Sequence, residues 1–103
     1  MKTYRTLERN RQILHKAISY YGSKNQLLML TEECGELIVA VNHLLRQRKG
    51  AMSNLIEELA DVSIMIQQII EYHRIDYAVH SQVLGKINRL KERLSTAQKE
   101  SEQ

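Results

Sequence analysis

The sequence has no proline and only four glycines in 103 residues, so it lacks most of the residues that form tight turns. A sandwich or barrel of short strands needs many such turns, and we therefore expect an all-α fold. The length is typical of one domain. Apolar periodicity predicts four helices, over residues 3–20, 24–48, 54–73 and 77–97, with Ser23, Ser53 and Asp76 as N-caps of the last three.

Short connections between long helices favour antiparallel neighbours, as in a four-helix bundle. We expect residues 1–97 to form a single helical domain and residues 98–103 to form a frayed polar tail. The two middle segments carry apolar residues around most of their circumference, which four helices in one small chain cannot bury completely. We therefore expect a homo-oligomer, most simply a dimer that completes the bundle, rather than a tightly wrapped monomer.

Several functional classes are disfavoured by composition. The single cysteine, Cys34, cannot form an internal disulfide or a multi-cysteine zinc site. No apolar run is long enough to span a membrane, and the polar N-terminus lacks a signal-peptide core, so we expect a cytoplasmic protein without a membrane partner. The net charge of +3 is below that of most dedicated nucleic-acid binders, and we expect no nucleic-acid partner.

Two pairs of acidic residues lie on apolar faces of the two middle helices. Glu33 and Glu36 are three residues apart, as are Glu58 and Asp61, so each pair shares a helix face. The neighbours on these faces are apolar: Met29, Leu30, Leu37, Ala40 and Leu44 in the first helix, and Leu55, Val62, Met65 and Ile69 in the second.

Carboxylates on an apolar face need a partner, because an unpaired buried charge is costly and neighbouring acids repel one another. Neither helix offers a basic residue near them. A solvated charged face and a divalent cation remain as explanations. Ligation by carboxylate oxygen alone suits Mg²⁺ or Mn²⁺, and no histidine lies in register for a zinc or di-iron site.

The runs EECGE (residues 32–36) and ELAD (residues 58–61) together resemble the EExxE…ExxD signature of the MazG-like all-α nucleoside triphosphate pyrophosphohydrolases. The resemblance spans residues 26–94. It implies Mg²⁺-dependent cleavage between the α- and β-phosphates, which yields a nucleoside monophosphate and pyrophosphate, and it implies a dimer or tetramer. By this resemblance Glu33, Glu36, Glu58 and Asp61 match the metal ligands, and Glu32 matches the first acid of the motif.

Glu32 lies about 100° around the helix from Glu33, so it either activates the attacking water or is a surface acid. Lys86, Asn88 and Arg89 on the last helix are candidates for binding the substrate phosphates, with a solvated basic face as the alternative. Tyr72 and His15 are candidates for stacking on the base, although each could instead fill the core or an interface.

Two other functions remain open. The acidic motifs also resemble those of phosphoribosyl-ATP pyrophosphatase. A non-catalytic helical dimer that binds a protein or RNA would explain why residues 1–30 hold six basic residues and one acid.

Overall fold

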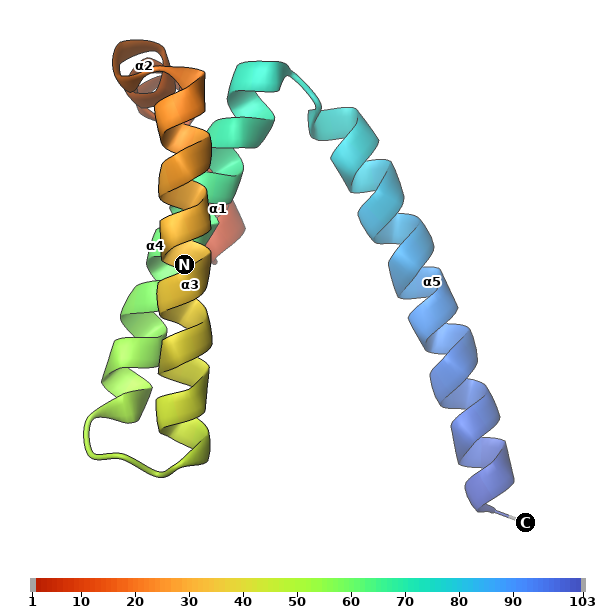
Figure 1. Ribbon diagram of the computed structural model, residues 1–103. Coiled ribbons are helices and arrows are strands. Elements are labelled where there is room, and N and C mark those ends of the chain that lie inside the picture. The colour runs from red at the N-terminus through yellow and green to blue at the C-terminus, as the bar shows by residue number, and fades with distance from the viewer. Residues whose placement is uncertain (1, 103) are drawn as a thin grey trace.

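The computed structural model describes residues 2–102, which form five helices and no strands (Figure 1). The prediction of an all-α fold is confirmed, but the predicted number of helices is wrong. The helices are α1 (Thr3–Arg9), α2 (Arg11–Tyr21), α3 (Ser23–Leu45), α4 (Ala51–His73) and α5 (Asp76–Ser101).

The segment predicted as one helix over residues 3–20 is interrupted at Asn10, which has φ −106° and ψ 22°. Its side-chain Nδ2 donates a hydrogen bond to the carbonyl of Thr6 at 2.8 Å, while its backbone N–H turns to the carbonyl of Leu7 at 3.1 Å. The asparagine side chain thus replaces the backbone donor that would continue the helix, which is the usual way asparagine competes with helical bonding.

The three predicted side-chain caps are also wrong. Ser23 and Asp76 are the first residues of α3 and α5, Ser53 lies inside α4, and none of the three helices has a side-chain cap hydrogen bond. Instead α3 and α4 follow Gly22 and Gly50, whose φ angles of 94° and 77° glycine adopts without steric strain.

The core lies where α2, α3 and α4 meet. The helices α3 and α4 form an antiparallel hairpin, and α2 packs against α4 at one end of it (Figure 1). Ile18 of α2 has no exposed surface. The buried apolar residues are Leu14, Ile18, Ala40, Ala51, Val62 and Met65.

The last helix leaves this core. Arg74 ends α4 in the left-handed conformation with φ 55°, and α5 then extends away from the hairpin, contacting α4 only near their junction (Figure 1). No residue of α5 is buried. One chain therefore does not close the predicted four-helix bundle, because nothing after Arg74 turns the last helix back onto α3 and α4. The helix continues to Ser101, and so includes most of the segment for which we predict a frayed tail.

Candidate metal centre

Three carboxylates converge at the middle of the α3–α4 hairpin. Glu33 and Glu36 come from one face of α3, and Glu58 comes from the facing turn of α4. One oxygen from each side chain lies within 4.8 Å of the other two. The i, i+3 spacing on α3 and the antiparallel course of α4 are sufficient to produce this cluster, which we call the acidic cluster.

Two members of the acidic cluster are partly buried and incompletely satisfied. The Oε2 atoms of Glu33 and Glu58 are buried, and neither has a hydrogen-bond partner. Burial raises the pKa of both carboxyls above the usual value, and the charge of Glu36 raises each pKa further. The two buried oxygens lack hydrogen-bond donors and lie beside a third carboxylate. Bound protons or a cation would offset the repulsion between these acids.

The donor set suits a hard cation. All three side chains offer carboxylate oxygen, and Mg²⁺ and Mn²⁺ prefer oxygen ligands while retaining several waters. A fully solvated acidic face does not describe Glu33 and Glu58, because each has a buried oxygen. Glu36 is exposed, so the cluster is open to solvent on one side.

Asp61, the fourth predicted ligand, lies beside the acidic cluster. It is exposed and is not among the three residues whose oxygens converge. It lies three residues after Glu58, on the same face of α4, and its charge raises the pKa of both Glu33 and Glu58.

The acidic cluster adjoins an open depression with a volume of about 470 Å³, lined by Glu32, Gly35, Glu36, Val39, Asn54 and Glu58. The exposed Glu32 therefore stands at the rim of the cluster and faces the space from which a ligand would approach. Sequence reasoning missed Asn54. Its position four residues before Glu58 places it on the same helix face, which is the signal that could have found it.

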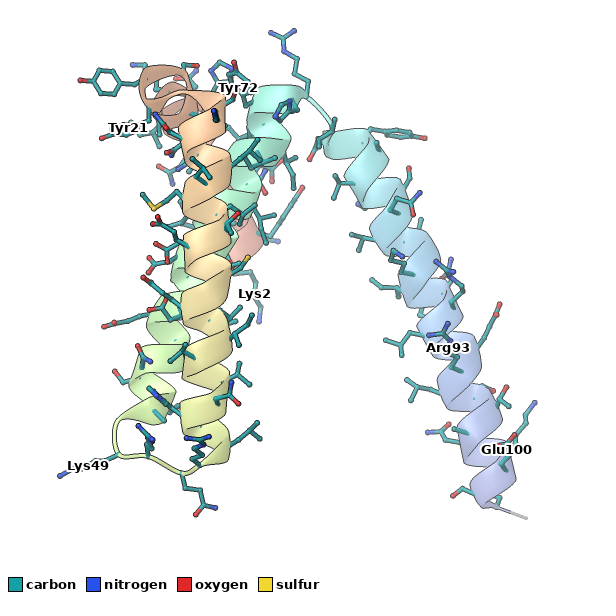
Figure 2. All side chains as sticks on the ribbon, in the orientation of Figure 1. Lys2, Tyr21, Lys49, Tyr72, Arg93 and Glu100 are labelled. Carbon is teal, nitrogen blue, oxygen red and sulfur yellow. The ribbon has the colours of Figure 1, made fainter. Side chains whose placement is uncertain are left out.

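The predicted phosphate-binding residues do not reach the acidic cluster within one chain. Lys86, Asn88 and Arg89 are exposed on α5, which stands apart from the hairpin. Figure 2 labels Arg93 on the same helix, well away from α3 and α4.

The predicted base-stacking residues contact each other at the far end of α4. The ring centroids of His15 and Tyr72 are 5.8 Å apart, with an interplanar angle of 32°. Tyr72 follows Glu58 by fourteen residues, which corresponds to about 21 Å along the helix. Figure 2 shows Tyr72 at the end of α4 where α2 crosses.

A second cavity, of about 810 Å³, lies between α1, α2 and the junction of α4 with α5. Its charged lining is balanced, with Arg9, Arg11 and Arg74 beside Glu8, Glu71 and Asp76. Arg11 Nε donates to Glu71 Oε2 at 3.1 Å, and Gln67 Nε2 donates to Glu71 Oε1 at 3.0 Å. This hydrogen bond with Glu71 raises the pKa of Arg11. We assign the Arg11–Glu71 contact to holding α2 on α4, and the Gln67–Glu71 contact within α4 to orienting the Glu71 carboxylate.

Comparison with known proteins gives one match. Residues 22–94 match the family described as the MazG nucleotide pyrophosphohydrolase domain, and this range includes the whole acidic cluster. No curated protein and no solved structure matches the chain. Within residues 2–102, no helix is both long enough and apolar enough to cross a bilayer.

Proposed function

The chain belongs to the MazG nucleotide pyrophosphohydrolase family, and we propose that it cleaves nucleoside triphosphates between the α- and β-phosphates, producing a nucleoside monophosphate and pyrophosphate. The observation that carries the proposal is the pair of buried, unpartnered oxygens of Glu33 and Glu58 beside Glu36. Such a cluster binds a cation far more readily than it binds a polyanion, so a triphosphate must arrive with metal.

We propose that Glu33, Glu36 and Glu58 hold Mg²⁺, with Asp61 as a fourth ligand and Mn²⁺ as a substitute. A bound Mg²⁺ would neutralise these acids and polarise the phosphate oxygens. Phosphoryl chemistry depends mainly on positioning and electrostatics, so no serine or cysteine nucleophile is needed.

We propose that Glu32 accepts the proton of the attacking water. Its exposed carboxylate lies at the rim of the depression, where the attacking water would lie between the acidic cluster and the incoming phosphate. From there it would orient this water and accept its proton.

A second copy of the chain would complete the site. The chain exposes 8521 Å², whereas a compact protein of 12.0 kDa exposes about 6,000 Å². The excess of about 2,500 Å² per chain, or about 5,000 Å² per pair, is the size of an obligate dimer interface. We therefore propose a homodimer.

Charge indicates which surfaces meet in this dimer. Residues 86–93 of α5 hold four basic residues and one acid, whereas the middle of the α3–α4 hairpin holds six acids. We propose that α5 of one copy brings Lys86, Asn88 and Arg89 to the acidic cluster of the other, where they would bind the outer phosphates. His15 and Tyr72 would reach a bound base only in such an assembly, and we retain them as candidates for stacking.

The test is pyrophosphate release from a panel of canonical and modified NTPs and dNTPs, and from phosphoribosyl-ATP, each with Mg²⁺ and with EDTA. We expect Mg²⁺-dependent release of pyrophosphate together with the matching monophosphate. Turnover of phosphoribosyl-ATP alone would favour the second enzymatic function, and release of single phosphates would mean a different cleavage. A complete lack of turnover, without stabilisation by Mg²⁺, would favour a non-catalytic binding dimer.

Glu58→Gln and Glu57→Gln form a matched pair of variants for this assay. Both remove one acid from the same turn of α4, but only Glu58 belongs to the acidic cluster, whereas Glu57 is exposed. We expect Glu58→Gln to abolish metal-dependent hydrolysis and Glu57→Gln to retain it.

A further inference from the structure

A buried hydrogen bond between two glutamine side chains joins α3 to α4. Gln26 Nε2 donates to Gln68 Oε1 at 2.7 Å. The two residues are only 7% and 6% exposed. Apolar contacts such as those of the buried Ala40, Val62 and Met65 have no preferred direction, whereas this hydrogen bond joins one named donor to one named acceptor with a defined geometry.

The glutamine pair and the acidic residues share one helical register. Seven residues after Gln26 is Glu33, and seven residues before Gln68 is Asp61. Ten residues after Gln26 is Glu36, and ten residues before Gln68 is Glu58. The carboxylate oxygens of these two residues converge. In an antiparallel pair of helices, equal steps in opposite directions reach facing positions, so one alignment of α3 on α4 produces all three pairings.

We infer that Gln26 and Gln68 are positioning residues, and that their buried hydrogen bond sets the register of α3 on α4 and thereby assembles the acidic cluster. Neither residue is itself a ligand. Only the expected change in metal affinity rests on the proposed function. The register of α3 on α4 can be measured without metal.

The acidic cluster needs such a constraint, because neighbouring carboxylates repel one another and the packing around them is apolar. Ala40, Val62 and Met65 are buried in the core formed with these helices and could tolerate a shifted alignment. A slip of one residue would rotate facing side chains by about 100°, and a slip of one turn would displace them by about 5.4 Å. Either slip would separate the two buried amides and leave both unsatisfied.

The amide pair lies toward the end of the hairpin that is opposite the loop between α3 and α4, where this loop constrains the helix register least. Residues 46–50 join α3 to α4 through Gln47 and Gly50, both with positive φ, and so constrain one end of the hairpin. Gln26 and Gln68 lie beyond the acidic cluster from this connection, about 10 Å along each helix from Glu33 and Asp61. The cluster is therefore held between the loop and the amide pair.

The experiment replaces both glutamines by methionine, which is similar in length but offers no amide. Replacing both partners of a buried hydrogen bond by apolar groups leaves stability nearly unchanged. We nevertheless expect Mn²⁺ affinity, measured from the electron paramagnetic resonance signal of free Mn²⁺, to fall by about tenfold or more, as for other residues that orient metal ligands. Unchanged affinity in a folded Gln26→Met, Gln68→Met protein would overturn the inference.

Leu14→Ala is the matched control, because it shortens a buried side chain of α2 and leaves every residue of α3 and α4 unchanged. We expect this variant to have a lower melting temperature but a Mn²⁺ affinity within about twofold of that of the unsubstituted protein, because distant sites affect each other little. If the double methionine protein does not fold, Gln68→Glu replaces it, since a carboxylate still accepts from Gln26 Nε2. Retained Mn²⁺ affinity in Gln68→Glu supports the inference, and a loss of about tenfold would contradict it.

A measurement without metal separates this inference from the proposed function. In a Cys34→Ser background, we expect the disulfide between Glu36→Cys and Glu58→Cys to form about tenfold more slowly when both glutamines are methionine, because side chains at these two positions converge in one register only. Equal rates in the two backgrounds would overturn the register inference. The unsubstituted protein could instead show the expected difference in disulfide rates but no Mn²⁺ binding. That result would overturn the proposed metal centre and support the register inference.

Discussion

A single charge placed among the exposed apolar residues of α5 should dissociate the proposed homodimer. These residues are Val83, Leu84, Ile87, Leu90 and Leu94. Ile87 lies in the middle of this helix and is 44% exposed in the isolated chain. Burial of its remaining surface contributes about 1 kcal/mol per copy, or about 2 kcal/mol for two symmetric copies. A carboxylate buried there adds a desolvation cost of about several kcal/mol. Ile87→Glu should therefore weaken association by on the order of 5 kcal/mol, about a thousandfold or more in Kd.

Sedimentation equilibrium of the two proteins at micromolar concentration measures this effect. We expect the unsubstituted chain to sediment at about 24 kDa, twice its mass of 12.0 kDa, and Ile87→Glu to sediment as a monomer. Ile87→Leu keeps an apolar side chain of the same volume at the same position, and should leave the dimer intact. An unsubstituted chain that stays monomeric, or a dimer that survives Ile87→Glu, would refute the reasoning from exposed area.

Three further predictions concern the acidic cluster and the core. Mg²⁺ should raise the melting temperature of the protein, by an amount equivalent to about 2.7 kcal/mol at a hundredfold excess over Kd, and should not raise that of Glu33→Gln. An equal rise in both proteins would contradict the assignment of Glu33. In EDTA, the free energy of unfolding should fall as the pH rises from about 4.5, because the raised pKa values of Glu33 and Glu58 keep their protons on the folded protein to higher pH than on the unfolded chain. Thermal melts across this range check the sign, and a protein with both residues changed to glutamine should lose this part of the slope. Ile18→Ala should destabilise the fold by about 2–5 kcal/mol, measured by urea unfolding, since Ile18 is fully buried where α2 packs on α4. A loss of less than 1 kcal/mol, well below this expected range, would mean that α2 is not held there.

Much of the candidate metal centre could be predicted because it depends on local spacing. Residues three apart on a helix share a face whatever the rest of the chain does, so Glu33 with Glu36, and Glu58 with Asp61, follow from the sequence. The resemblance to the MazG-like enzymes is confirmed by the match over residues 22–94. Which oxygens would be buried without partners could not be predicted, because burial depends on how α3 and α4 approach each other.

The helix boundaries show a similar division. The scarcity of glycine and proline determines that the chain is helical, but two of its four glycines also start α3 and α4 through positive φ angles. The capping preference of serine predicted that α3 and α4 begin after Ser23 and Ser53, whereas the glycine backbone angles make them begin earlier. At Asn10 the reverse occurred, since a side-chain hydrogen bond ended a helix that apolar periodicity would continue.

By itself, then, the sequence determined the helical class, the two acidic pairs and the charge contrast between the middle of the chain and its last helix. Only the tertiary structure decided that Gln26 meets Gln68, that His15 meets Tyr72, and that α5 leaves the hairpin. The first group follows from residue types and from spacings within one helix, which local geometry converts directly into faces. The second depends on contacts between residues far apart in sequence, whose partners are chosen by packing and by the few backbone angles at the helix junctions.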